Sequence, residues 1–346
     1  MSPGVGVHYW NDARGKPGGV AGLDFGAQIP RNLLVNGGFT VNQRAVGVTV
    51  AGGSGFVCDR WFAVSSSANL QVFQIPPSAF SSFTSANLRF VASADGVTGV
   101  VRYAGIESID SIKLQGQSLT LAVSYVVNVT GNTSVTVKVV MGTGTDQNFT
   151  GSGSYATGNS VLASMTLGLG VSNTLLTQVV SFNTPSNLSE LSLELDYTCV
   201  TAGFADKFDI MGFSLAQGNA AIPYNVYSFG MELSGCQRYF QRYNSSGDTF
   251  GPLGIGMCLS GTVALVAMRY VVQMRAAPVV TQSGNWAVRS AANTLLPVTS
   301  FTAANRDVHA AELDLIIGGG GLVAGNSTYF QANNSAAGDV FFDAEL

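Results

Sequence analysis

The sequence predicts an all-β protein: a jelly-roll sandwich, followed by a short helix and a smaller C-terminal β domain. Apolar and polar residues alternate with a period of two over much of the chain, as in strands with one buried face. Turn-forming Gly, Ser and Asn separate these stretches, and the chain contains 42 glycines. Hydrophobic residues make up 46% of the 346 residues, which is enough for a core in each of two domains.

Charged residues make up only 10% of the chain, against about 25% in typical soluble domains. The surface therefore consists of Ser, Thr, Asn, Gln and Gly, or much of it is covered in an oligomer; a low-charge monomer is the alternative. The net charge is −4 and no run of Lys or Arg occurs, so we expect no nucleic-acid binding. We also expect no signal peptide, because residues 1–10 lack a basic start and an apolar run. We expect no membrane insertion, because no apolar stretch reaches about 18 residues.

Residues 1–31 differ from the rest, and we expect them to form an extended arm. Residues 10–19 follow neither a helical nor a strand period and are dense in Gly and Pro. Tyr9, Trp10 and Phe25 lie in this arm, whereas disordered tails are poor in aromatic residues. The arm is therefore expected to dock onto a partner protein, with a disordered terminus as the alternative.

Residues 32–228 are expected to form the sandwich. Residues 119–129 and 135–139 alternate on either side of a Gly131-Asn132 turn, which predicts a hairpin with one buried face. Residues 191–197 predict another half-buried strand. Shorter strands are expected at 88–92, 100–104 and 178–182. Many short strands separated by turns are typical of a sandwich or jelly roll.

Residues 229–246 are expected to link the two β domains through a helix. Leu233, Cys236, Phe240 and Tyr243 follow the spacing of one helix face, which predicts a helix over 231–242.

Residues 247–346 are expected to form the C-terminal β domain, which we predict to hold copies of the chain together as a homotrimer. Residues 257–272 are almost continuously apolar, as in a strand buried on both faces. Residues 313–317 alternate before a run of four glycines, 318–321, which fits close packing of chains at a three-fold axis or a flexible loop. Phe341 and Phe342 predict a final strand or a contact between chains.

Residues suited to catalysis are scarce. The two histidines are His8 and His309, and no nucleophile, zinc-protease or phosphate-loop motif is present. The four cysteines form no CxxC pair, so we expect buried free thiols. We expect no enzyme, no cofactor and no metal. A polysaccharide depolymerase would need two carboxylates about 5–10 Å apart. The acids that could supply them are Asp95, Glu107, Asp110, Asp196, Asp206 and Asp209.

Glycan binding requires less, because an aromatic platform and a few polar side chains match the apolar faces and polar rims of sugars. Trp61, Tyr103 and Tyr155 are the candidate carbohydrate-binding residues. Phe62 and Tyr197 are further aromatic residues that could form such a platform. Each of these side chains has the alternative of lying in the sandwich core.

Six segments resemble phage tail-fibre-like proteins that carry a jelly roll of the carbohydrate-binding-module type. The opening strand of that fold matches residues 32–39, and it is followed by Gln43-Arg44 and by Asp59-Arg60-Trp61. Residues 206–215 match its last strand, 232–242 the helix after it, and 272–280 part of the C-terminal domain. The residues of the structural motif are Asn36, Phe39, Gln43, Arg44, Asp59, Arg60, Gln237 and Arg238.

The resemblance implies a structural protein of a bacteriophage particle, assembled in the bacterial cytoplasm and located in the virion. It fits a trimeric tail fibre or adhesin that touches host-surface glycan and contacts other virion proteins through the arm. The alternative is a capsid decoration, head-fibre or collar protein that binds no sugar. Arg44, Asp59 and Arg60 are expected to be paired, with an Asp–Arg pair fixing the start of the sandwich. Related sandwiches carry calcium, but Thr40 replaces one of the expected acids, which leaves Asp209 as the matched ligand candidate.

Overall fold

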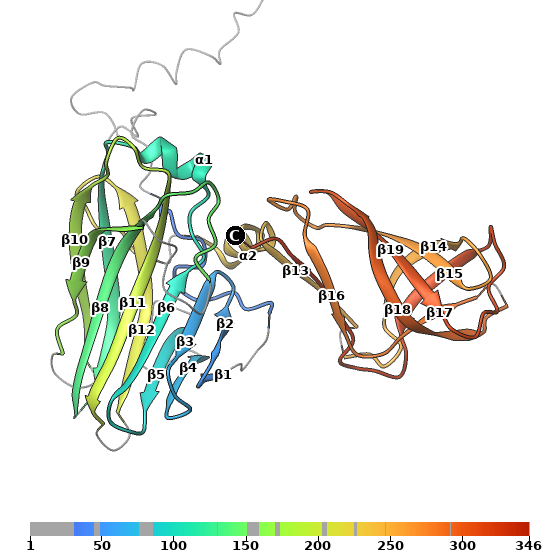
Figure 1. Ribbon diagram of the computed structural model, residues 1–346, viewed down its shortest axis with the longest axis horizontal. Helices are drawn as coiled ribbons and strands as arrows, with labels where there is room; N and C mark the ends of the chain where they lie inside the picture. Colours follow the sequence, from blue (N-terminus) through green and yellow to red (C-terminus); the bar gives the residue numbers. More distant parts are fainter. Residues whose placement is uncertain are drawn as a thin grey trace, which may run out of the picture.

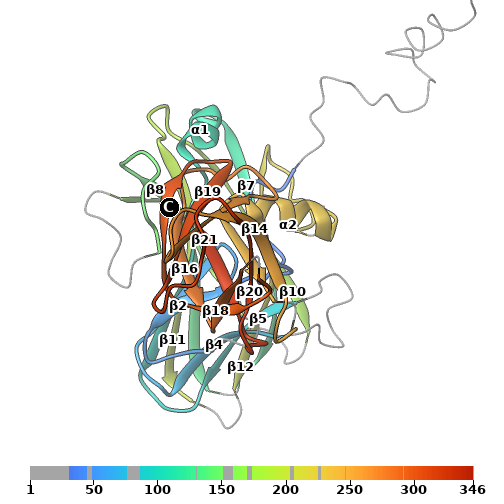
Figure 2. The same cartoon turned by 90° about the vertical axis from the view of Figure 1, so that its right-hand side faces the viewer.

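The computed structural model describes residues 31–44, 49–75, 86–129, 131–150, 159–169, 174–202, 206–224, 227–245, 247–290 and 292–345. Residues 1–30, almost all of the expected arm, lie outside this set. Figure 1 shows a β sandwich and a smaller β domain side by side, with the helix α2 (Phe229–Gln237) between them. Figure 2 looks at the molecule from the side of the smaller domain, which lies in front of the sandwich.

Two six-stranded antiparallel sheets form the sandwich. In sheet A the order is β1 (Thr49–Ala51), β4 (Leu70–Ile75), β5 (Asn87–Ala92), β12 (Lys207–Gln217), β7 (Ser118–Asn128) and β10 (Leu175–Asn183). In sheet B it is β2 (Ser54–Cys58), β3 (Trp61–Ser65), β6 (Val97–Tyr103), β11 (Glu190–Thr201), β8 (Asn132–Gly142) and β9 (Ser160–Thr166). Two short helical turns, α1 (Ser108–Ser111) and η1 (Ile112–Leu114), follow β6.

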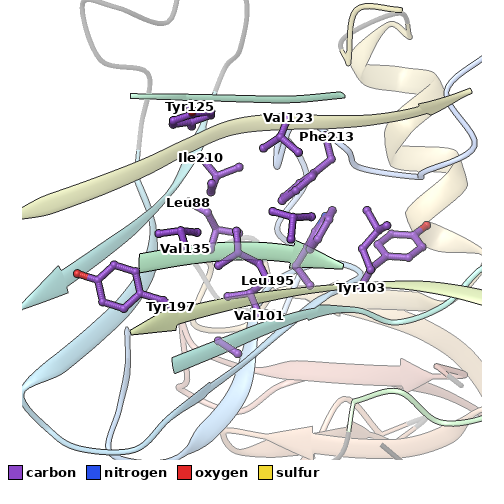
Figure 3. Packing of buried hydrophobic residues seen from close by; sticks show 14 of the residues in the cluster. Leu88, Val101, Tyr103, Val123, Tyr125, Val135, Leu195, Tyr197, Ile210 and Phe213 are labelled. Atoms are coloured by element: carbon purple, nitrogen blue, oxygen red, sulfur yellow. The ribbon is translucent and has the colours of Figure 1, made fainter. Parts of the chain in front are cut away.

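The inward faces of the two sheets supply one hydrophobic core (Figure 3). Every second residue of the central strands points into it, including Val123 of β7 and Leu195 of β11. Aromatic rings stack across the core, with 4.9 Å between the centroids of Trp61 and Phe213. The predicted jelly-roll sandwich is therefore confirmed, because the alternation seen in the sequence matches the buried faces of both sheets.

The predicted hairpin between β7 and β8 is wrong. β7 pairs with β10 and β12 in sheet A, whereas β8 pairs with β9 and β11 in sheet B. The chain crosses from one sheet to the other after Asn128. This places both strands centrally, so that β7 is buried along nearly its whole length rather than on one face.

The smaller domain contains a three-stranded sheet and a closed barrel. The sheet has the order β13 (Phe240–Asn244), β21 (Asp339–Asp343) and β16 (Val279–Ser283). The barrel has the order β14 (Pro252–Cys258), β15 (Val263–Arg269), β19 (Ala310–Ile317), β18 (Leu295–Arg306), β17 (Trp286–Arg289) and β20 (Ser327–Ala332). Phe330 and Phe342 belong to its core, so the final strand expected around Phe341 and Phe342 is present.

Two local predictions need correction. The helix ends at Gln237 rather than at Arg242, and Phe240 already lies in a strand that pairs with β21. The apolar run 257–272 is not one strand, because a turn after Cys258 separates β14 from β15. Within the glycine run, Gly320 and Gly321 have φ values of 68° and 101°, so a turn in the left-handed region requires glycine there.

The four cysteines are buried and free, as predicted. Among the described residues, no helix is long and apolar enough to cross a membrane.

Candidate functional site

Two of the three predicted sugar-binding aromatic residues lie in the core. Trp61 and Tyr103 are each 1% exposed, and their ring centroids are 5.1 Å apart. The Tyr103 hydroxyl accepts a hydrogen bond from the Val35 amide. These two predictions are wrong, because both side chains point inward from neighbouring strands of sheet B. Tyr155 lies outside the described residues.

The residues of the predicted structural motif gather where the sandwich meets the smaller domain. Asn36 adopts a φ of 60° and its side chain donates to the carbonyl groups of Val41 and Asp59. The Asn36 amide donates to the carboxylate of Glu232 on α2. Phe39 is fully buried against Trp61. The opening loop of the sandwich thus holds the linking helix directly.

Gln43 fixes the carboxylate of Asp59. Its amide donates to Oδ1 over 2.9 Å and its side chain to Oδ2 over 2.6 Å. The same side chain also donates to the carbonyl of Phe240 on β13. Burial raises the pKa of Asp59 to about 6, although the hydrogen bonds from Gln43 act in the opposite direction.

Arg44 and Arg60 bind the last residues of the chain. The Arg44 guanidinium lies between the rings of Phe56 and Phe240, and it pairs with Asp343 over 2.7 Å and with Glu345 over 3.1 Å. Arg60 is fully buried, pairs with Glu345 and donates to the carbonyl of Gly105. We call Arg44, Asp59, Arg60, Asp343 and Glu345 the interdomain cluster. The expected Asp–Arg pair is wrong, because both arginines take C-terminal acids as their partners.

Further polar contacts join the same two parts. Arg238 binds Glu107 with two hydrogen bonds of 2.8 and 2.9 Å, and the Tyr239 hydroxyl donates to Glu107 as well. These bonds outweigh the effect of burial, so the pKa of Glu107 is lowered. The carbonyl of Gln237 accepts a bond from Gln241. The motif residues therefore build an interface between domains rather than a ligand site.

A second feature lies on the outer face of sheet B. One row crosses all six strands through residues that face one another in register. In order from β2 to β9 these are Phe56, Phe62, Arg102, Glu194, Lys138 and Ser164, and we call them the cross-sheet row. The residues next to them along the strands, such as Ala63, Val101 and Leu195, point into the core. The row therefore faces away from the core.

The charges of the row compensate one another. Arg102 donates to Glu194 over 2.9 Å, and Lys138 pairs with both Glu194 and Asp196. Burial disfavours the Lys138 ammonium, but its bonds to the two carboxylates outweigh this and raise the pKa of Lys138. Arg102 and Glu194 are each 8% exposed in their side chains, and Lys138 is 29% exposed. Phe56 and Phe62 pack edge to face at one end of the row, 5.3 Å apart.

Sequence reasoning placed Phe62 among the aromatic residues that could form a platform but selected its neighbour Trp61. The signal that could have found it is the alternation along β3, in which Trp61 and Ala63 share the core face while Phe62 takes the other. Lys138 and Glu194 were recognised only as polar positions of alternating strands. Their pairing depends on register between strands far apart in the chain.

The structure gives the weak calcium candidate a different partner. Asp209 receives two hydrogen bonds of 2.7 Å from Arg89, so both of its carboxylate oxygens are occupied. Within the described part of the chain, no group of three or more His, Cys, Asp or Glu residues could hold a metal ion.

No protein-family model matches the chain, and no curated protein matches it. Among solved structures, the carbohydrate-binding module TmCBM61 in complex with β-1,4-galactotriose is 12% identical, covers 54% of this chain and 99% of its own, with a TM-score of 0.34. The enzymatically active domain of tailspike protein 4 from bacteriophage CBA120 is 10% identical over 54% of this chain and 21% of its own, with a TM-score of 0.36. A xylan-binding domain of family 22 is 15% identical over 52% and 99%, with a TM-score of 0.29. At these TM-scores the matches assign neither a family nor a function.

Proposed function

We propose that the chain is a non-enzymatic structural component of a bacteriophage particle, a tail fibre or surface adhesin that binds host-surface glycan. The cross-sheet row carries the binding part of this proposal. It combines a partly exposed aromatic side chain, Phe62, with charged groups and the Ser164 hydroxyl on one face of sheet B. That combination matches the apolar faces and polar rims of sugar rings.

The ion pairs within the row favour a sugar as ligand. Glu194 holds both Arg102 and Lys138, so these long side chains are fixed before any ligand arrives. Binding then costs less conformational entropy than it would with free side chains. Two cations and two carboxylates cancel in charge, so the face offers directed hydrogen bonds through its partly exposed groups, Lys138 and Asp196, without a net field.

The acids named as candidates for polysaccharide cleavage support the non-enzymatic proposal. Glu107, Asp196 and Asp209 are each paired with Arg or Lys, so their carboxylate oxygens are engaged within the protein, and the pKa of Glu107 is lowered by its bonds to Arg238 and Tyr239. Glu190 has a pKa raised to about 7, as a general acid would, but its residue is fully buried. A sugar therefore has no access to that carboxyl group.

The place in a virion rests on the order of the sequence motifs from residue 32 to residue 280. The proposal includes assembly in the bacterial cytoplasm, a homotrimer, and contact with other virion proteins through residues 1–31. The low share of charged residues, 10%, supports a surface that neighbouring copies partly cover.

The second candidate function is a capsid decoration, head-fibre or collar protein with no affinity for sugar. The interdomain cluster favours it, because its motif residues Arg44, Asp59 and Arg60 join the two domains.

A glycan array probed with the full chain tests the proposal. We expect retention of one class of glycans, and we expect Phe62→Ala and Lys138→Gln to weaken it about tenfold or more, equivalent to about 1.4 kcal/mol. Lys113→Gln is the matched control, because Lys113 is an exposed lysine that pairs with Asp110 away from the row. Thermal unfolding of each variant confirms that the sandwich is intact. A wild-type chain that retains no glycan would exclude the adhesin and leave the second candidate.

A further inference from the structure

We propose that the outer face of the barrel around β14 is the surface on which a second copy of this chain packs side by side. This goes beyond the glycan site and does not depend on it. It gives the self-association expected from the sequence a specific face, which we call the barrel band: Ile255, Met257, Leu265 and Tyr329.

The register of the barrel joins these side chains into one surface. Ile255 lies opposite Tyr329 of β20, and Met257 lies opposite Leu265 of β15. Val263 lies two residues before Leu265 on β15 and therefore on the same face. It lies opposite Ile316 of β19, and these two residues extend the band. Their neighbours along the strands are Gly256, Val266, Leu315 and Phe330. Of these, Val266, Leu315 and Phe330 belong to the barrel core. The band therefore faces outward across four strands.

The fold itself does not require apolar residues in the band. The barrel is closed, and its core is complete without them. Nevertheless Ile255 is 72% exposed and Met257 is 46% exposed. A contiguous apolar patch on a soluble domain marks an interaction surface, because each such side chain loses hydrophobic free energy while it faces water.

The charges beside the band identify the occupant. Arg289 of β17 lies opposite Tyr329 on one side, and its guanidinium binds only the neutral side chains of Gln331 and Asn293 in the described part of the chain. On the other side, Asp314 of β19 lies opposite Leu265, and Glu312 lies two residues before it. No ion pair joins either acid to a base among the described residues, and Glu312 accepts a bond from the amide of Asn305.

This arrangement is complementary to itself. A rotation axis parallel to the strands would bring the bands of neighbouring copies together and set the Arg289 side of one copy against the Glu312 and Asp314 side of the next. A stable interface needs about 800 Å² from each partner, more than a typical exposed apolar patch of about 300–600 Å², so both charged sides take part. An unrelated partner would give no reason for opposite charges on the two sides of one band.

Light scattering of the full chain after size-exclusion chromatography tests the band. We expect the wild type to elute at a multiple of its single-chain mass of 35.9 kDa, and Ile255→Asp to elute at that single mass. Val279→Asp is the matched control, because Val279 is an exposed β-branched residue on β16, outside the barrel. We expect it to keep the wild-type mass.

A charge exchange tests the orientation of the copies. Arg289→Glu alone should weaken association about tenfold, and Arg289→Glu combined with Glu312→Arg should restore it. A wild type that stays at single-chain mass would overturn both the band and self-association. Association that survives Ile255→Asp would overturn the band alone, and neither result bears on the glycan array.

Discussion

At the scale of single residues, Glu190 is an acid that the sandwich buries without a basic partner in hydrogen-bond contact among the described residues. Its residue is fully buried where the loop before Phe149 packs against β11. Oε2 accepts the amide of Gln147 over 2.7 Å, whereas Oε1 has no hydrogen-bond partner among the described residues. Burial raises the pKa of Glu190 to about 7; Asp146 adds to the rise, and Arg275 and Arg60 oppose it.

We expect Glu190→Gln to stabilise the protein at pH 8 and to make its free energy of unfolding depend less on pH. Below pH 4.5 the carboxyl group is protonated in both the folded and the unfolded chain. As the pH rises toward 7, the unfolded chain ionises first and the folded state of the wild type loses stability. Glutamine does not ionise, so the free energy of unfolding of the variant should exceed that of the wild type at pH 8 by on the order of 1 kcal/mol or more.

Urea unfolding at pH 4.5, 6 and 8 measures this difference. Asp110→Asn, an exchange at an exposed ion pair of α1, is the control and should leave the profile unchanged. Parallel profiles for Glu190→Gln and the wild type would show that the buried carboxyl group is not responsible.

Arg44 and Arg60 show what sequence can predict at this scale. Their charge in a charge-poor chain marked them as paired residues, and each of them is paired. The sequence could not predict their partners. Asp343 and Glu345 come close to the two arginines through the pairing of β21 with β13, which depends on the fold of the whole smaller domain. For Trp61 and Phe62, residue type alone could not predict burial. Both are aromatic, and the face of β3 on which each lies decides which one is buried.

At the scale of elements, local alternation was sufficient to locate strands but not to pair them. β7, β11 and β19 were found from their period of two, which each strand carries in its own sequence. The turn after Asn128 has no local feature that distinguishes a hairpin from a crossing between sheets. The turn between β14 and β15 does have a local signal, Ser260-Gly261, but apolar residues on both sides of it made the run 257–272 resemble a single buried strand.

The pairing of β14 with β15 depends on Gly256, and we expect Gly256→Ala to destabilise the barrel. An added Cβ would lie 1.9 Å from the carbonyl oxygen of Leu265, so the two strands would have to separate. We expect a loss of about 3 kcal/mol, at the upper end for overpacking. Gly319→Ala is the control, because nothing lies within 4 Å of its added Cβ, and it should change stability by less than about 0.5 kcal/mol.

Calorimetry of both glycine variants distinguishes these outcomes. A Gly256→Ala variant with the melting temperature of the wild type would mean that the backbones of β14 and β15 lie further apart than in the structure.

At the scale of the whole molecule, the interdomain cluster determines whether the sandwich and the smaller domain behave as one body. Arg60 lies in the sandwich, Glu345 near the end of the chain, and both are buried. Arg238 with Glu107 and Arg275 with Asp146 bridge the same two parts. Because buried charges must remain paired, separation of the domains would cost the free energy of breaking these pairs. We therefore expect the two parts to unfold together.

Arg60→Ala should uncouple them. The substitution removes one of the two guanidinium partners of Glu345, which keeps Arg44, and leaves the Gly105 carbonyl without its side-chain donor; breaking a buried pair costs about 3–5 kcal/mol, and the remaining contact with Arg44 places this case near the lower end. We expect the single calorimetric transition of the wild type to split into two, with the smaller domain or the sandwich melting first, and small-angle scattering to report a wider range of interdomain distances. Lys113→Ala removes an exposed pair and should leave one transition. A single, unshifted transition in Arg60→Ala would show that packing of α2 and β13, rather than the buried charges, holds the two domains together.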